Sequence, residues 1–148
     1  MKKVGQSTID KALVILANRL HKPSEFFRTT SNTTNYLKLI LAELEHEEFH
    51  ILLLNNQHGL IKDICMFKGT IDGATVYPRE VIKAALKHNA AAVILAHNHP
   101  SGITKPSEAD KEITKRLKEA LGLVDIRILD HVIVGGMNTY SFATEGIL

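Results

Sequence analysis

The chain has 148 residues, a net charge of +2, and a composition of 45% hydrophobic and 23% charged residues. These values are close to those of ordinary globular domains and exclude a disordered or fibrous chain. The length suits one domain and is too short for an eight-stranded α/β barrel, which needs about 250 residues. The weakly basic charge gives little support for nucleic-acid binding.

The cysteine content and the N-terminal apolar run indicate in which cellular compartment the protein is expected. Cys65 is the only cysteine in the sequence, so it cannot form an internal disulfide or build a cysteine-rich zinc site. The apolar run at 12–17 resembles part of a secretory signal, but Asp10 and Lys11 precede it directly and it is too short. No stretch approaches the roughly 20 apolar residues that a membrane-spanning helix needs. We therefore expect a cytoplasmic protein without a membrane segment.

The first third of the chain is predicted to be helical. Hydrophobic residues recur at helical spacing over 9–20, which predicts an amphipathic helix with Ser7 and Asp10 as its capping pair. A second helix is expected to begin at Asn32 or Thr33, because apolar residues follow from there with the same period.

The pattern then changes to that of strands. Dense apolar residues at 49–54 predict a buried strand, 55–59 a turn, and 60–67 the partner strand of a hairpin. A short strand is expected at 75–77, and Pro78 suits the first position of a helix that runs to about residue 88.

The last part of the chain alternates strands and helices. The uninterrupted run AAAVILA at 90–96 predicts a strand covered on both faces. Ser107 is expected to open a helix to about residue 121, and short strands are expected at 126–129, 131–134 and 140–142. The alternation indicates the α/β class, with a mixed sheet flanked by helices.

Two histidines and an aspartate near the end of the buried strand form a candidate metal site. In an extended chain, positions i and i+2 point to the same side, so His97 and His99 can direct two imidazoles at one point. Asp110 is the third residue of the helix that Ser107 would cap, and its side chain would point back toward the helix N-terminus. Three such ligands leave the fourth tetrahedral position of Zn²⁺ open for water, which is typical of catalytic zinc.

A purely structural interpretation of the same residues is also available. Ser107 and Asp110 fit a helix N-cap with an acid in the first turn, and that role alone would explain both residues. The fragment HxH occurs in other metal proteins, but the chain is too short for a barrel hydrolase and lacks the PCxxC of zinc deaminases. Iron oxygenases usually place the acid beside the first histidine in all-β folds, unlike the order found here.

A metal-bound water works best with a carboxylate nearby to accept its proton. The segment ELEHEEF offers four acids, and the sequence alone does not choose between them: Glu43, Glu45, Glu47 and Glu48. The alternative is that all four belong to the solvated end of the second helix.

These residues resemble a known family. The pattern of a distant Glu, HxHP, six residues and SxxD is that of the JAMM (MPN+) metalloproteases. The segments FKGTIDGATVYPREV, AAVILAHNHPSG, PSEAD and LDHVIVGG resemble its RadC-type branch, named for DNA repair. The resemblance covers 26–148, implies the three-layer, cytidine-deaminase-like JAMM fold, and leaves 1–25 as an N-terminal helical arm.

The resemblance also implies roles for individual residues. His97, His99 and Asp110 would bind zinc, Glu47 would be the general base, and Ser107 would stabilise the developing oxyanion. The implied activity is that of a zinc-dependent hydrolase, a metallopeptidase or isopeptidase, acting on a protein or peptide.

A second functional class stays open. The name of the branch favours a DNA repair or recombination factor, or a metal-dependent nuclease. Full-length RadC proteins resemble a helix-hairpin-helix DNA-binding module joined to this domain, and 1–25 do not show that module. The chain is most similar to short RadC-like proteins of prophages and genomic islands. Asp130 and His131 are expected to be a structural hydrogen-bonded pair rather than ligands.

Overall fold

A computed structural model describes residues 5–20, 23–72 and 75–148. The described residues form four helices and one five-stranded sheet with the strand order β2-β1-β3-β4-β5. Only β3 and β4 pair in parallel; the other neighbours are antiparallel. The helices are α1 Gln6–Arg19, α2 Thr30–Leu41, α3 Pro78–Lys87 and α4 Glu108–Gly122, and the strands are β1 Glu48–Leu54, β2 Leu60–Lys68, β3 Ala92–Asn98, β4 Arg127–Gly135 and β5 Asn138–Ser141.

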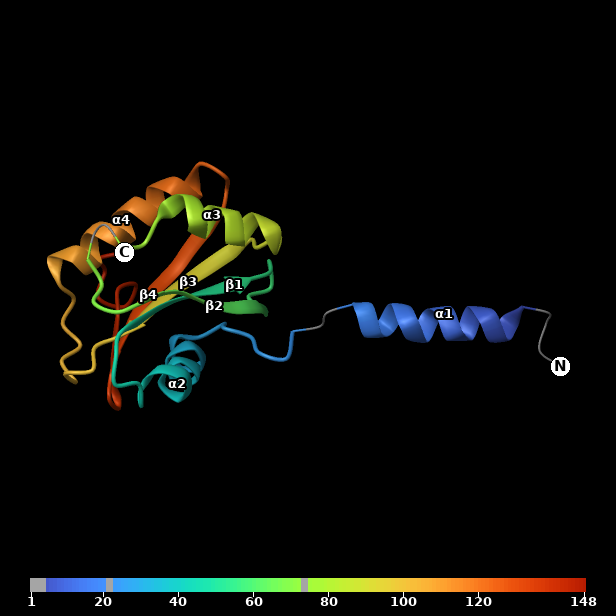
Figure 1. Cartoon of the computed structure of the whole chain (residues 1–148), viewed down its shortest axis with the longest axis horizontal. Coiled ribbons are helices and arrows are strands. Elements are labelled where there is room, and N and C mark those ends of the chain that lie inside the picture. The colour runs from blue at the N-terminus through green and yellow to red at the C-terminus, as the bar shows by residue number, and fades with distance from the viewer. Residues whose placement is uncertain (1–4, 21–22, 73–74) are drawn as a thin grey trace.

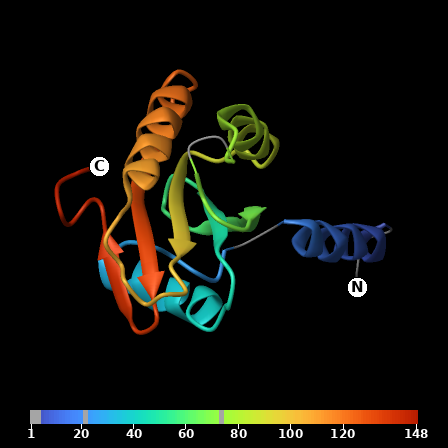
Figure 2. The same cartoon turned by 60° about the vertical axis from the view of Figure 1, so that its left-hand side comes forward.

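The sheet forms the middle of three layers, which confirms the predicted α/β class and layer arrangement. Helices α3 and α4 cover one face, and α2 covers the other (Figure 1; Figure 2). Alternate residues of β1 divide between two hydrophobic clusters: Ile51 packs on the α3/α4 side and Leu52 on the α2 side. Every residue of the central strand β3 is buried, as the apolar run predicted, but the strand spans 92–98 rather than 90–96 and so includes His97 and Asn98.

Several predicted element limits need correction. Residues 127–129 and 131–134 belong to one strand, β4, because the pairing with β3 shifts by one residue before Asp130 but continues with Asp130 opposite Ile94. The expected strand at 75–77 is absent, and these residues form a turn and the N-cap of α3. Helix α2 begins earlier than predicted, because the side chain of Thr29 accepts a hydrogen bond from the backbone N–H of Asn32.

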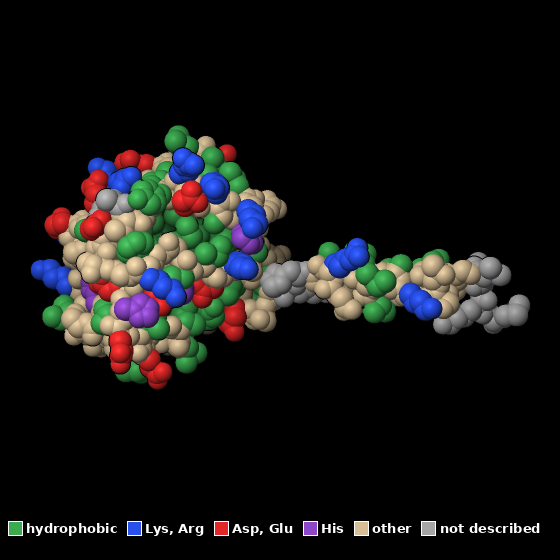
Figure 3. Space-filling model, in the orientation of Figure 1, with side chains coloured by type: hydrophobic (Ala, Val, Ile, Leu, Met, Phe, Trp, Pro, Cys, Tyr) green, Lys and Arg blue, Asp and Glu red, His purple; other side chains and the backbone are tan. Residues whose placement is uncertain are grey.

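Helix α1 differs from the rest of the chain in its environment. It stands apart from the sheet in both views (Figure 1; Figure 2), and none of its residues is buried. The predicted capping pair is wrong: the N-cap is Gly5, which has no side chain to accept a hydrogen bond, and Asp10 accepts one from Gln6. Hydrophobic and basic side chains lie together on its surface (Figure 3). Across the described residues, no helix combines the length and apolar character needed to cross a membrane.

Candidate metal centre

The three predicted ligands converge where β3 ends and α4 begins. His97 pairs with Ile133 of the neighbouring strand, and the backbone N–H of His99 donates to the carbonyl of Val134 at 2.8 Å. The Nε2 atoms of the two histidines are 3.0 Å apart. The Asp110 carboxylate lies 3.1 Å from His97 Nε2 through Oδ1 and 3.3 Å from His99 Nε2 through Oδ2. One atom from each residue can therefore reach a common ion.

Hydrogen bonds behind His97 fix the orientation of its ring. The hydroxyl of Thr114 donates to the backbone carbonyl of Asp110 at 2.7 Å, so its oxygen must accept from Nδ1–H of His131. Neutral His131 then offers Nε2 as an acceptor, and His97 Nδ1–H donates to it at 2.8 Å. His97 Nε2 is therefore left with a lone pair that faces the other two ligands.

His99 reaches the same state through a backbone group. Its Nδ1–H donates to the carbonyl of Ile103 at 2.8 Å, which leaves a lone pair on Nε2. The loop that supplies this carbonyl passes close to β4 and needs a positive φ of 83° at Gly102. A Cβ atom on Gly135 would lie 2.7 Å from the Gly102 carbonyl oxygen. Both glycines thus allow the loop to present Ile103 to the histidine.

The charges at the centre favour a cation. Burial raises the pKa of Asp110, but hydrogen bonds with His97 and His99 outweigh it and hold the pKa far below its usual range. The hydrogen bond with Asp110 raises the pKa of His99. Burial, followed by the nearby charge of His97, lowers the pKa of His131 well below its ordinary value, which agrees with a neutral His131. When both rings are neutral, the ionised carboxylate and the two inward lone pairs are the donor set that zinc and similar ions accept, so a proton shared between Asp110 and either Nε2 must leave when the ion binds.

Ser107 and Asp110 also form the predicted helix cap. The Ser107 hydroxyl oxygen accepts from the backbone N–H of Asp110 at 3.0 Å, and the Asp110 carboxylate accepts from the backbone N–H of Ser107 at 2.8 Å. The capping role and the place beside the histidines are therefore compatible, because Asp110 has two carboxylate oxygens to share. The capping box orients the carboxylate and leaves the Ser107 hydroxyl hydrogen available for donation.

Glu47 lies on the same side of the sheet as the three ligands. It immediately precedes β1 and alternates with Phe49, whose ring stacks on His97 with centroids 6.0 Å apart. After the hydrogen bond with Asp110 and the opposing effect of burial, the charge of Glu47 contributes to the raised pKa of His99. Its carboxylate also accepts the backbone N–H of Ile71 at 3.0 Å, and its carbonyl accepts that of Gly69. Glu47 is thus half-buried, held in place and close to the centre.

The other three acids of the segment lie elsewhere. Glu43 and Glu45 are exposed to solvent, in agreement with a solvated helix end. Glu48 is buried, but it occupies the alternate position on β1 and contacts His46 and His50 instead. Strand alternation therefore separates Glu47 from Glu48, which the sequence alone could not do because the strand's first residue was not defined.

Asn98 is a residue of this region to which sequence reasoning gave no role. Its buried side chain accepts from the backbone N–H of Glu48 at 2.8 Å and donates to the carbonyl of His46 at 2.8 Å. These two bonds bracket Glu47 in the chain. Because Asn98 stands between the two histidines, it ties the backbone of Glu47 to the strand that carries them. The sequence signal that could have revealed this role is a side-chain amide, which has both a donor and an acceptor, between the two histidines.

Asp130 and His131 do not bond to each other through their side chains. The Asp130 carboxylate accepts from the hydroxyl of Ser141 and from the backbone N–H groups of His131 and Ala143. Its role is to join β4 to the turn after β5. His131 lies on the opposite face, behind His97. Neither residue supplies a ligand in the group that could hold a metal here.

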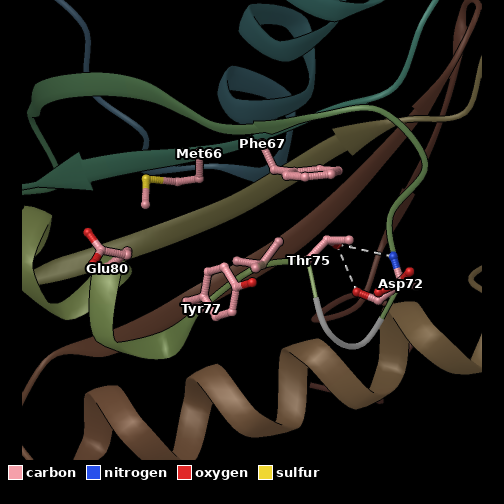
Figure 4. A pocket seen from close by; sticks show the side chains of 7 residues that line it. Met66, Phe67, Asp72, Thr75, Tyr77 and Glu80 are labelled. Atoms are coloured by element: carbon pink, nitrogen blue, oxygen red, sulfur yellow. Dashed lines mark hydrogen bonds between the residues drawn. The ribbon is translucent and has the colours of Figure 1, made fainter.

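A cavity of about 400 Å³ lies between the end of β2 and the start of α3 (Figure 4). Its wall includes Asp72, which follows the Ile71 backbone that Glu47 binds. Tyr77 borders it and is 62% exposed. The lining residues are Met66, Phe67, Asp72, Thr75, Val76, Tyr77 and Glu80.

Taken together, the three-layer fold and the converging ligand triad define an α/β domain of the JAB type with a candidate metal centre. The family described as RadC-like JAB domain matches residues 27–147, and the chain belongs to that family, as the sequence resemblance predicted.

Relatives of this chain carry UPF0758 names. It is 55% identical over 143 residues to UPF0758 protein YeeS of Escherichia coli (strain K12), which covers 97% of both chains. It is 54% identical over 144 residues to UPF0758 protein YfjY of the same organism, covering 97% of this chain and 90% of the relative. A UPF0758 protein of Vibrio campbellii (strain ATCC BAA-1116) is 52% identical over 141 residues, or 95% of this chain and 62% of the relative. The chain thus spans less than two thirds of that longer protein.

Proposed function

We propose that this domain is a zinc-dependent hydrolase that cleaves an amide or isopeptide bond in a protein or peptide. The observation that carries the proposal is the convergence of His97 Nε2, His99 Nε2 and the Asp110 carboxylate, with hydrogen bonds behind both rings that turn their lone pairs inward. Zinc held there would polarise the scissile carbonyl and lower the pKa of a bound water to about 7.

The side chains around the centre have complementary tasks in this proposal. Glu47 accepts the proton of the attacking water and passes it to the leaving amine, a role suited to a half-buried carboxylate on the ligands' face. The hydroxyl of Ser107, whose oxygen is already engaged by the Asp110 N–H, donates to the oxyanion of the tetrahedral intermediate. Asn98 keeps the backbone of Glu47 in register with the histidines.

Replacement of Glu47 tests this division of tasks. Glu47→Gln should retain the zinc content of the wild type but lose about 10²- to 10⁴-fold in activity, because only the proton acceptor is removed. Glu45→Gln, which alters an exposed acid two residues away, is the matched control and should change neither quantity. Cleavage is followed by mass spectrometry on linear and isopeptide-linked peptide libraries. Full activity in Glu47→Gln would contradict the proposal.

A role in DNA repair or recombination, or as a nuclease, stays a prediction from the family resemblance. The same variants incubated with plasmid and single-stranded DNA distinguish it. Cleavage of DNA but not of peptides, or binding that weakens steeply with salt, would favour that class.

A further inference from the structure

A second group of metal-ligand side chains lies on the other face of the sheet. Glu48 and His50 occupy alternate positions of β1 and face the α2 side, and Cys65 lies opposite His50 on the edge strand β2. The pairing shifts by one residue between Phe49 and His50, which indicates a β-bulge in β2. That bulge brings Cys65, rather than Met66, beside the histidine.

The distances between these three side chains suit one ion. His50 Nε2 lies 2.9 Å from Glu48 Oε1, and the ligand atoms of all three residues lie within 4.8 Å of one another. Zinc bonds of about 2.0–2.3 Å place neighbouring ligand atoms roughly 3–4 Å apart. Side-chain rotations alone can therefore bring the carboxylate, the imidazole and the sulfur into one coordination sphere.

A carboxylate behind His50 orients its ring. His50 Nδ1 lies 2.7 Å from Asp63 Oδ1, and Tyr36 donates its hydroxyl hydrogen to the other oxygen of Asp63 at 3.4 Å. A carboxylate on the far ring nitrogen is the usual outer partner of a metal-binding histidine. It directs Nε2 of His50 toward Glu48 and Cys65.

A further imidazole, that of His46, lies at the surface beside Glu48. His46 Nε2 lies 2.7 Å from Glu48 Oε2, and the His46 side chain is 54% exposed. An ion can therefore arrive from solvent past His46, which then becomes its fourth ligand. A donor set with one sulfur and two imidazoles favours Zn²⁺ or a similar transition-metal ion over Mg²⁺ or Ca²⁺.

We propose that Glu48, His50 and Cys65, with His46 completing the sphere, form a second transition-metal site that joins β1 to β2. Its place in the chain gives it a consequence for the first centre: an ion bound to Glu48 holds the backbone next to Glu47. The inference stands independently of the proposed hydrolysis, because it depends on metal binding alone.

The two sites differ in one spectroscopic property, since only the second contains sulfur. The metal-free full-length chain is titrated with Co²⁺, and the sulfur-to-cobalt charge-transfer absorption in the near ultraviolet is recorded together with the number of equivalents bound. The wild type should bind two equivalents and develop the band. Cys65→Ser should bind one equivalent and show no band, while His97→Ala/His99→Ala should bind one and keep the band.

Two further variants distinguish a preorganised metal site from nonspecific binding of Co²⁺ to the Cys65 thiol. Glu48→Gln and His50→Ala should each weaken the band-forming step by at least about tenfold in Co²⁺ affinity, with circular dichroism confirming that each variant is folded. A wild type that saturates without the band overturns the proposal, and so does a band that forms equally well in both variants. Failure of the first centre would appear separately, as one equivalent bound with the band intact.

Discussion

The two ligand clusters share one sheet but differ in what stands behind their histidines. At the first centre, neutral acceptors fix the rings: His131 behind His97, and the Ile103 carbonyl behind His99. At the second, a partly exposed carboxylate, Asp63, stands behind His50. Neutral partners leave the lone pairs directed inward, whereas a charged partner behind the ring also stabilises its protonated form. We therefore expect tighter metal binding at the first centre.

Removal of a direct ligand should have the largest effect on this comparison. Asp110→Asn removes the anionic ligand and weakens the cap of α4, so metal affinity at the first centre should fall by more than the roughly 10- to 100-fold typical of outer partners. Activity should disappear with it. Metal analysis of the purified chain, with peptide cleavage, measures both.

Glu108→Gln is the matched control for Asp110→Asn, because Glu108 is in the same helical turn and its side chain is 92% exposed. It should bind metal as the wild type does. If Asp110→Asn also retained the metal, the carboxylate would not be a ligand.

Loss of a residue that orients a metal-binding histidine through hydrogen bonds should have an intermediate effect on metal affinity. Thr114→Val leaves the Nδ1–H of His131 buried without its acceptor and releases the ring of His97. We expect zinc affinity to fall by about 10- to 100-fold, as measured by competition with a chromophoric chelator. Thr114→Ser keeps the hydroxyl and should restore most of the affinity. Equal affinity in the valine and serine variants would show that the hydrogen-bond chain is unimportant.

A substitution that disturbs the loop behind His99 should have a smaller effect than the loss of Thr114. In Gly135→Ala, the added methyl group would lie 2.7 Å from the Gly102 carbonyl oxygen, so the loop must move. The expected loss is about 1–3 kcal/mol in the free energy of unfolding, measured with urea. Gly122→Ala adds a methyl group with nothing within 4 Å and should cost little or stabilise the chain. A Gly135→Ala variant as stable as the wild type would contradict the described close approach.

The smallest expected effect is a loss of stability at high pH, caused by Tyr36, which hydrogen-bonds to Asp63 behind the second cluster. Burial, and then the charge of Asp63, raise the pKa of Tyr36 to about 12. Because the folded chain holds this proton more tightly, stability should be complete below the unfolded pKa of about 10 and fall as pH rises toward 12. Tyr36→Phe should lose less stability across that range than the wild type. Tyr77→Phe, at an exposed tyrosine, should behave as the wild type, and identical pH profiles in all three would refute the assignment.

Much of the fold and of the candidate metal centre could be predicted from local patterns in the sequence. The buried strand β3 and the cap of α4 follow from an apolar run and from the SxxD spacing, and together they bring His97, His99 and Asp110 to one point. Long-range pairing was beyond such reasoning. The hydrogen-bond chain from Thr114 through His131 to His97 joins α4, β4 and β3. The position of Cys65 opposite His50 depends on a β-bulge in β2 that no local pattern reveals.

Single residues account for the remaining differences between the predicted and the observed structure. Asp130 looked like an interruption between two strands, but its carboxylate is satisfied by Ser141 and by two backbone N–H groups, so β4 continues through it. The choice of Glu47 over Glu48 depended on which residue begins β1, since a shift of one position changes the face.

A crystal structure of the zinc-loaded protein, with anomalous scattering at the zinc edge, would locate the ion at the first centre. We expect it about 2.0–2.2 Å from Nε2 of both His97 and His99 and from a carboxylate oxygen of Asp110, with water at the remaining position. Nδ1 of each ring should keep its hydrogen bond, to His131 and to the Ile103 carbonyl. An ion bound through Nδ1, or no ion within bonding distance of these three side chains, would contradict this prediction.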